Sequence, residues 1–470
     1  MTDRALAWLT GSLVCLTRIA WISPIEQDID GVRFVGALRS FDVTRMHPHP
    51  PGYPVLIAPA MALHRALGLA PGLALSLVSA LSLGLLAAML VRLALQCTLD
   101  RPRAVLAALV ATSGTAVTAY ALRPASDVLG LALAITALSL AAERTLRAAL
   151  LSLVTLALLA GARPALALFA LPIACVALYT AHIHRALARA IAVFLLGFSA
   201  WLLPLCASQG ARTLLSATLA HARGHFTTYG GTIATEAGPA RRALALAQAT
   251  FAHGLSAHSA SQNTATIITA TLLCVCALWG LGALASRSFA GRLLTTCTAL
   301  YALWAWLAQN VMWSPRHALP LLACLALSAL GVGQNLSALK RTWSVILLGA
   351  LLVLPMSIES LRVAHIQRTQ PSAPRCMARA LTALAHPRTD LIVSTQMPQW
   401  LRYLTPELRI RYTPDLASAQ RMAQQNHWRL IVSSDVAGSI DAPGARVIAR
   451  CKSDPRVWPM LNDLAWIALP

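Results

Sequence analysis

The chain reads Gln-Asp-Ile-Asp-Gly-Val-Arg-Phe at residues 27–34 and His-Pro-His-Pro-Pro-Gly-Tyr-Pro at residues 47–54. This stretch follows the first apolar segment and is dense in carboxylates and imidazoles, which the later apolar segments mostly lack. Placing carboxylates at the end of a membrane helix bundle costs free energy, so such residues are expected to have a function. We therefore expect this loop to carry functional groups and the apolar remainder of the chain to support it.

The composition is typical of a polytopic membrane protein. Hydrophobic residues make up 57% of the 470 residues and charged residues 12%, whereas soluble proteins carry about 25% charged residues. The formal net charge is +21, from 38 Lys and Arg against 17 Asp and Glu. In a soluble protein this charge would suggest nucleic acid, but here much of the arginine lies in short loops between apolar segments. We therefore expect membrane lipids as partners and no nucleic acid.

The apolar segments predict an all-α membrane domain over residues 1–362. A spanning helix needs about 20 mostly apolar residues, and about eleven segments are predicted to span the membrane on this basis. Two amphipathic pieces in the first outer loop, 31–41 and 55–67, are predicted to be interfacial helices. The predicted spans are 5–23, 73–95, 104–121, 128–142, 148–160, 164–181, 190–206, 266–285, 293–311, 318–336 and 343–358.

Basic residues fix the predicted orientation. If the N-terminus is cytoplasmic, the basic clusters at 92–103, 144–147, 185–189, 287–292 and 340–341 all fall on the cytoplasmic side, as the positive-inside rule requires. The loop at residues 24–54, the tail and the residues Asp127, Arg163 and Arg316 then face outward. We expect a multi-pass protein of the bacterial inner (plasma) membrane.

The tail, residues 363–470, is predicted to be a small extracytoplasmic α/β domain. Short apolar runs at 391–394, 408–412, 430–433 and 446–449 read as strands, with helical patterns at 398–404 and 415–425 between them. No Gly-rich phosphate loop occurs in it, so no nucleotide site is expected. Cys376 and Cys451 can form a disulfide if the tail lies in an oxidising compartment, a question that the sequence leaves open.

The distribution of acids points to chemistry on the outward side. Acids contribute little to topology, so their concentration there needs another cause, such as a general base or a divalent cation held by oxygens. Asp30, which precedes an amphipathic helix, is the candidate we favour, whereas Asp127 can cap the following helix, act in function, or do both. Seven of the ten acids in residues 1–361 are on this side: Glu26, Asp28, Asp30, Asp42, Asp127, Glu236 and Glu359.

These features resemble the GT-C superfamily of membrane glycosyltransferases, which includes the protein O-mannosyltransferases and the lipid A aminoarabinose transferases, and above all its bacterial branch. The shared order is an acid after the first helix, an amphipathic segment and a Pro-rich turn into a second interfacial helix. Arg123-Pro-Ala-Ser-Asp127 resembles the family's second acid, and Gly161-Ala-Arg163-Pro164 resembles its short basic turn. The resemblance covers residues 5–360. Many relatives have two consecutive acids in the first loop, whereas Gly31 follows Asp30 in this chain. The metal requirement is therefore open, unless Asp28 takes the place of the second acid.

The resemblance implies transfer of a sugar from a polyprenyl-phosphate donor to an extracytoplasmic glycan, lipid or cell-envelope polymer. Asp30 would be the general base, with inversion expected, and Asp127 would orient the acceptor or help hold a divalent cation. Arginine suits phosphate oxygens, so Arg163, Arg316 and Arg123, with the adjacent His317, are assigned to the donor. The alternative is that these arginines anchor the chain at lipid headgroups.

The His-Pro turn supplies further candidates. His47 and His49 are two residues apart in a turn that prolines restrict, so they can face the same way and bind a metal, a sugar or a phosphate. Tyr53 is assigned to the substrate, although the turn around it also serves to fix local geometry. His221 and His225, in a long outer loop, are weaker candidates for substrate contact.

Two other functions remain open. A transporter or flippase of lipid-linked intermediates would carry charges midway through several spans and broken helices in matching halves. The predicted spans are nearly free of central charge, which favours surface chemistry over passage. A non-catalytic envelope assembly protein, with the bundle as an anchor, is the second alternative.

Overall fold

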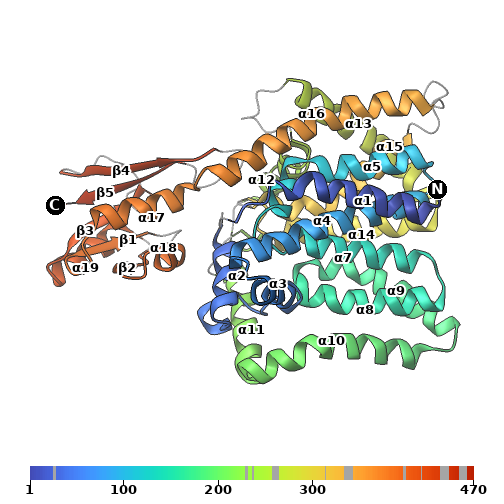
Figure 1. The fold of residues 1–470 in the computed structure, drawn as a ribbon. Helices are drawn as coiled ribbons and strands as arrows, with labels where there is room; N and C mark the ends of the chain where they lie inside the picture. Colours follow the sequence, from blue (N-terminus) through green and yellow to red (C-terminus); the bar gives the residue numbers. More distant parts are fainter. Residues whose placement is uncertain are drawn as a thin grey trace. The chain divides into compact units, whose positions relative to one another are not determined.

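The computed structural model describes residues 1–24, 28–227, 231–235, 238–256, 264–312, 314–332, 342–394, 398–413, 415–434, 444–454 and 463–469. The chain divides into two compact units, one made of Met1–Pro24 and Arg33–His365 and the other of Ile25–Val32 and Ile366–Pro470. The predicted domain boundary, between residues 362 and 363, falls inside a continuous helix, α16 (Thr342–Thr369), and remains a prediction. Figure 1 colours the chain from blue to red along the sequence.

The first unit is helical, as predicted. Each predicted span corresponds to a helix or to two consecutive helices, and the interfacial segments correspond to α2 and α3. The helices before the tail are α1 (Asp3–Ile19), α2 (Ile29–Arg39), α3 (Pro54–Leu67), α4 (Pro71–Gln96), α5 (Arg101–Ser113), α6 (Thr115–Ala121), α7 (Asp127–Ala142), α8 (Leu146–Ala162), α9 (Ala167–Ile183), α10 (Leu187–Gln209), α11 (Ala211–Thr227), α12 (Pro239–Ala247), α13 (Thr264–Arg287), α14 (Phe289–Ala308), α15 (Leu319–Val332) and α16.

Several of these helices are long and apolar enough to cross a membrane. Within the described ranges, five meet the requirement by length and composition, or six if the bent pair of α5 and α6 is one span. α3, α7, α8 and α15 belong to shorter apolar helical segments. The chain is therefore a multi-pass membrane protein, and the predicted number of spans remains a prediction.

The outer helices carry the apolar surface that a bilayer requires. On α1, Trp8, Leu9, Leu13 and Leu16 are more than half exposed, while 83% of the most apolar window of α4 is buried inside the bundle. Large exposed apolar patches are rare on soluble monomers. The exposed side chains of α1 are thus suited to contact lipid, and α4 forms part of the core.

The bend between α5 and α6 is 71°. At this break the backbone N–H of Thr115 donates to the Ser256 hydroxyl at 2.9 Å, and the Thr115 hydroxyl donates to the His253 carbonyl at 2.8 Å. These bonds satisfy groups that the interrupted helix leaves without partners. The bend turns the chain toward the loop that carries Arg123 and Asp127.

The second unit contains a five-stranded mixed sheet, which confirms the predicted α/β tail. Its order is β2-β1-β3-β5-β4, with β1 parallel to β2 and β3, and β5 antiparallel to β3 and β4. All four predicted strands are present, and the structure adds α17 and β5. The elements are α17 (Ala373–Leu384), β1 (Asp390–Val393), α18 (Pro398–Leu404), β2 (Ile410–Arg411), α19 (Leu416–Gln425), β3 (Arg429–Ser433), β4 (Arg446–Lys452) and β5 (Asp463–Leu469).

Apolar side chains cover both faces of this sheet. Ile392, Ile431 and Trp466 pack against Met377 and Leu381 of α17 on one face. Leu391, Val393, Leu430 and Ile467 pack against Ala419 and Ala423 of α19 on the other. The central strands are therefore continuous apolar runs, as expected of strands buried on both sides.

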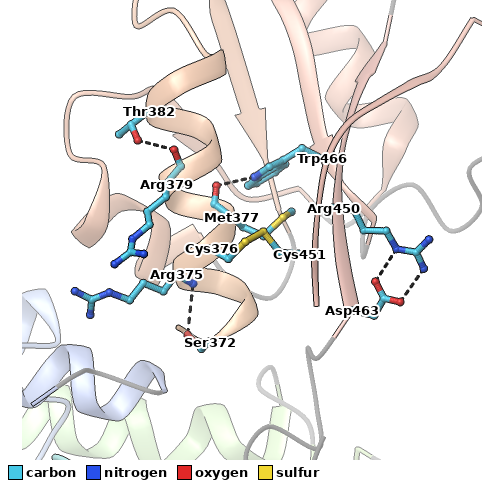
Figure 2. Close-up of a disulfide and its surroundings, with 10 residues drawn as sticks. All are labelled: Ser372, Arg375, Cys376, Met377, Arg379, Thr382, Arg450, Cys451, Asp463 and Trp466. Carbon is cyan, nitrogen blue, oxygen red and sulfur yellow. Dashed lines mark hydrogen bonds and ion pairs between the residues drawn. A yellow bond between two sulfur atoms is a disulfide. The ribbon is translucent and has the colours of Figure 1, made fainter. Parts of the chain in front are cut away.

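A disulfide between Cys376 and Cys451 ties α17 to β4, as Figure 2 shows, with 5.8 Å between the Cα atoms. The indole N–H of Trp466 donates to the Met377 carbonyl at 2.9 Å beside it. The structure thus answers the question that the sequence left open about this pair. The other cysteines of the described chain are free.

Replacing Cys376 by Ser is expected to lower the free energy of unfolding of the second unit by about 2–4 kcal/mol, because the disulfide shortens a long loop of the unfolded chain. Limited proteolysis and thermal unfolding would measure the loss. Cys175→Ser, which removes an exposed free thiol, is the matched control. Alkylation of both Cys376 and Cys451 in unreduced protein would contradict the assignment.

Candidate functional site

Asp127 is the first residue of α7 and lies at a buried helix N-terminus. The preceding helix, α6, ends at Ala121, and Pro124 disfavours its continuation because proline lacks a backbone N–H. Ser126 occupies the N-cap position, but its side chain makes no capping hydrogen bond. A carboxylate in the first turn is favoured by the helix dipole. Asp127 therefore stabilises the helix start without being its cap, so the capping alternative does not account for the residue.

Two arginines from other segments approach this carboxylate. Arg163, at the C-cap of α8, places its Nη2 2.6 Å from Asp127 Oδ1, and its Nη1 donates to the Ser126 hydroxyl at 3.1 Å. Arg316, in the 3-10 helix Pro315–Ala318, places its Nε 3.9 Å from the same oxygen. We call Ser126, Asp127, Arg163 and Arg316 the Asp127 cluster. It combines one carboxylate with two guanidinium groups, so its formal charge is positive.

The Asp127 carboxylate is buried with spare hydrogen-bonding capacity. Its side chain is 3% exposed, and within the described parts of the chain neither oxygen accepts a hydrogen bond of acceptable geometry. The contact with Arg163 is therefore a close ion pair without hydrogen-bond alignment. A buried acceptor without a donor is costly and rare in native structures. A hydroxyl group or a cation brought by a ligand would satisfy it.

Gly130 lets α8 approach α7 at this point. A Cβ atom at Gly130 would lie 2.5 Å from the Cβ atom of Arg163. Gly130 is one turn beyond Asp127 on α7, so this close approach is what brings Arg163 within reach of the carboxylate.

Helix α14 supports both arginines. The Tyr301 hydroxyl donates to the His317 carbonyl at 3.0 Å, next to Arg316, and the Trp304 indole N–H donates to the Ala165 carbonyl at 3.2 Å, two residues after Arg163. Tyr301 is fully buried and close enough to Asp127 to interact with its charge. In the sequence, Tyr301 and Trp304 look like ordinary residues of an apolar helix, so no pattern marks them as site residues.

Arg242 in turn holds the end of α14. It is completely buried, and its guanidinium donates to the carbonyls of Trp306 at 2.7 Å, Gly231 at 2.6 Å and Gln309 at 2.8 Å. Carbonyls at a helix C-terminus have no partner within the helix, so a cation there is stabilising. Arg242 thus fixes the helix that positions the Asp127 cluster.

Arg123 and His317 are also buried, at 4% and 8% exposure. The Arg123 guanidinium carbon lies 3.8 Å from the centroid of the Tyr120 ring, which is a cation–π contact. His317 follows Arg316 directly, and its carbonyl accepts a hydrogen bond from the Tyr301 hydroxyl. Both predicted residues are thus held in place by neighbouring aromatic groups.

The His-Pro turn forms a second group, around aromatic rings. His49 is buried, and the centroid of its ring lies 4.5 Å from that of Tyr53, 5.5 Å from Phe34 and 5.5 Å from His221. His221 in turn lies 4.8 Å from His225. The histidine-aromatic group (Phe34, His49, Tyr53, His221 and His225) therefore joins the predicted turn to α11.

His47 has different neighbours from His49. A Cβ atom at Gly36 would lie 2.9 Å from the His47 ring, so this ring lies flat against α2. The backbones of His47 and Asp42 exchange hydrogen bonds at 2.6 and 2.9 Å. Burial lowers the pKa of His47, although the Asp42 carboxylate opposes the effect. Burial thus favours the neutral form of the His47 ring, which can donate and accept hydrogen bonds.

The first loop is attached to α10. The amide side chain of Gln209 accepts from the Val43 N–H at 3.1 Å and donates to the Phe41 carbonyl at 3.3 Å. Val43 also packs with Leu205 and Leu214. Asp42 caps the 3-10 helix Val43–Arg45, and the hydrogen bond from the Thr44 hydroxyl holds the pKa of Asp42 below its usual range. Asp42 therefore has a local structural role.

Asp28 and Asp30 lie in the second compact unit. Asp28 Oδ1 accepts from the Gly31 N–H at 2.7 Å, so it caps the start of α2. Asp30 is buried in the first turn of α2, at 7% exposure. Of the predicted site residues, the structure brings Asp127, Arg163 and Arg316 into one cluster and His49 and Tyr53 into another. Glu26 and Glu236 lie outside the described residues.

The candidate residues do not form a preformed metal site. In the described segments, no three His, Cys, Asp or Glu side chains gather closely enough to hold a metal ion.

The sequence matches no protein-family model and no curated protein. Solved structures do match. ArnT from Cupriavidus metallidurans bound to undecaprenyl phosphate is 11% identical, with a TM-score of 0.59 over 99% of this chain and 97% of that one. The apo state of that protein gives 11% identity and a TM-score of 0.57 over 98% and 97%.

An archaeal protein shows the same similarity. The oligosaccharyltransferase AglB from Archaeoglobus fulgidus, in complex with an inhibitory peptide and a dolichol-phosphate, is 12% identical with a TM-score of 0.53. The match covers 92% of this chain and 69% of AglB. At these identities the similarity establishes the fold. The resemblance seen in the sequence is confirmed at that level, and the chain has the ArnT-like fold of the GT-C membrane glycosyltransferases.

Proposed function

We propose that this protein is a membrane glycosyltransferase that moves a sugar from a polyprenyl-phosphate donor to an extracytoplasmic glycan, lipid or cell-envelope polymer. The observation that carries the proposal is the Asp127 cluster, in which a buried carboxylate with spare acceptor capacity lies beside two arginines. The fold shared with ArnT and AglB supports it, since those proteins were solved with undecaprenyl phosphate and a dolichol-phosphate.

Arg163 and Arg316 would bind the phosphate of the donor. Asp127 neutralises only one of their two charges, so the cluster retains a positive charge for an anion. A guanidinium fork matches phosphate oxygens better than an ammonium does. A lipid phosphate is also the leaving group, and its departure mainly requires neutralisation of the negative charge that develops on it. Arg123 is assigned the same role, with His317 as a neighbouring donor.

Asp30 would act as the general base. The first turn of α2 favours a carboxylate, because the positive end of the helix dipole lies there, and Asp28 secures that turn through the Gly31 N–H. The base would accept the proton of the acceptor hydroxyl as its oxygen attacks the anomeric carbon from the face opposite the phosphate. The expected result is inversion at that carbon. Asp127 would orient the acceptor or help hold a divalent cation, and His47, His49 and Tyr53 would contact the sugar.

The same proposal includes the topology. About eleven spans in a bacterial inner membrane, with a cytoplasmic N-terminus, would place the tail outside. The Cys376–Cys451 disulfide supports this orientation, because disulfides persist in the periplasm and are rare in the cytosol.

Replacing Asp30 by Asn should reduce sugar transfer by about 10²-fold or more, since the amide cannot accept the acceptor proton. The measurement is release of undecaprenyl phosphate from a panel of undecaprenyl-phosphate sugars by the purified protein in lipid, with cell-envelope glycans and lipids supplied as acceptors. Asp3→Asn, which alters an exposed acid paired with Arg101, is the control for insertion and general charge. Full activity of Asp30→Asn would refute the assignment, and the absence of donor-dependent release in the wild type would favour a transporter or an assembly protein.

Replacing Arg316 by Gln is expected to weaken binding of undecaprenyl phosphate by about tenfold or more, because a charged hydrogen bond to the phosphate is lost. The fold should tolerate this change, since Asp127 keeps its closer partner Arg163. Binding is measured by titration of the purified protein, with Arg65→Gln as a control at an exposed arginine. Unchanged affinity in Arg316→Gln would exclude this residue from the donor site.

A further inference from the structure

A cavity lies between α1, α5 and α16, and none of its lining residues belongs to the Asp127 cluster. Its volume is about 440 Å³, within the range of small-molecule sites. Its lining includes the apolar side chains Leu13, Leu109 and Val353 and the polar side chains Arg18, Ser113 and Ser357.

The polar and apolar groups of this cavity lie at different heights along the helices. Arg101 at the start of α5 is paired with Asp3 at the start of α1, with 2.7 Å between Nε and Oδ1, so these helices run in parallel. Ser357 donates to the Ser113 hydroxyl at 3.2 Å, and a Cβ atom at Gly349 would lie 3.0 Å from a methyl group of Leu106. α16 therefore runs parallel to α5. Arg18 and Ser113 lie near the C-terminal ends of α1 and α5, and Leu13, Leu109 and Val353 lie about one turn before the polar residues of their helices.

Arg18 supplies the only charge in this lining. It is 7% exposed, its Nε atom has no hydrogen-bond partner, and no carboxylate in the described part of the chain forms an ion pair with it. The acid nearest to the cavity in sequence is Glu359 on α16. It is two residues from Ser357, which places it roughly 200° around the helix, and it pairs with Arg362 at 3.5 Å.

An anion bound beside Arg18 would offset the free-energy cost of burying its charge. Leaving a charge buried without a partner costs several kcal/mol. Its position in the last turn of α1 contributes about 0.3–1 kcal/mol through the helix dipole, which does not cover that cost. Ser113 can help to bind an anion, because its hydroxyl accepts from Ser357 and keeps its own hydrogen to donate.

An exposed apolar surface borders the cavity. Leu13 is 57% exposed, and it lies on the same apolar surface of α1 as Leu9 and Leu16. A ligand can therefore enter from the membrane with an apolar chain beside Leu13 and a charged group beside Arg18.

We propose that this cavity binds an anionic phospholipid of the surrounding bilayer. Arg18 and the Ser113 hydroxyl hold the phosphate, and one acyl chain lies along Leu13, Leu109 and Val353. A bulk lipid fits better than a scarce polyprenyl phosphate, because a partner present at high concentration keeps the buried cation compensated at all times. This inference does not depend on the glycosyltransferase proposal.

The test is lipid binding by the purified full-length protein, followed by native mass spectrometry and thermal unfolding in detergent. The probes are dioleoylphosphatidylglycerol, dioleoylphosphatidylcholine, undecaprenyl phosphate and inorganic phosphate. We expect the wild type to retain phosphatidylglycerol at least about tenfold more tightly than phosphatidylcholine, a difference of the size that one charge-assisted contact provides. Inorganic phosphate should not displace it. Equal retention of the two phospholipids, or preferential retention of undecaprenyl phosphate or inorganic phosphate, would overturn the proposal.

Four variants distinguish a loss of lipid binding from a loss of folding. Arg18→Gln removes the cation, Val353→Trp fills the cavity but keeps Arg18, and Arg147→Gln alters an exposed arginine elsewhere. The first two should lose the preference for phosphatidylglycerol, and the third should keep it. Arg18→Met should be at least as stable as the wild type without lipid, and added phosphatidylglycerol should raise the melting temperature of the wild type only. Wild-type lipid retention in Arg18→Gln, or a loss of lipid-free stability in Arg18→Met, would contradict the assignment.

Discussion

The buried ion pair between Asp127 and Arg163 is the interaction on which the proposed donor site depends. It joins the start of α7 to the end of α8, and Gly130 makes the approach of the two helices possible. Taking both charges out of water costs several kcal/mol for each ion, and their attraction offsets this only with good geometry and further hydrogen bonds. Here one arginine is closely paired and the carboxylate keeps unused acceptor capacity. An apolar pair would stabilise this position as well or better, so function is the more economical explanation for the charges.

Hydrogen bonds from three other side chains hold the segments around this pair in place. Trp304 bonds the turn after Arg163, Tyr301 bonds the segment of Arg316 and His317, and Arg242 secures the end of the helix that carries both aromatic residues. A ligand phosphate would therefore meet guanidinium groups that are already ordered, which lowers the entropic cost of binding. The second unit has a separate core and a disulfide, so its stability does not rest on the pair.

The sequence predicted the apolar helices because their signal is local, but it did not predict α11 and α12, which lie in the segment expected to be a long outer loop. Each predicted span coincides with a helix or with two consecutive helices, the two segments predicted to be interfacial coincide with α2 and α3, and the strand patterns located four of the five strands. The missed strand, β5, is a continuous apolar run without the alternation that marks a half-buried strand, because it lies in the interior of the sheet between β3 and β4. The bend between α5 and α6 was also missed, since bonds to the distant residues Ser256 and His253 accompany it.

The site was harder to predict than the fold. Charge placement singled out Asp127, Arg163 and Arg316, but their convergence arises from packing between segments far apart in sequence. Tyr301, Trp304 and Arg242 act through backbone carbonyls, which leave no pattern in a sequence. The turn at residues 47–54 was predicted from its prolines, yet only the structure separates His47, against α2, from His49, among aromatic rings.

The central claim is that the Asp127 cluster binds the phosphate of a polyprenyl-phosphate donor. An experimental structure of the protein in lipid nanodiscs with added undecaprenyl phosphate tests it most directly. The account predicts phosphate density within hydrogen-bonding distance of Arg163 and Arg316, with Asp127 still beside them. Phosphate density at another place on the protein, with no ligand beside the Asp127 cluster, would contradict it.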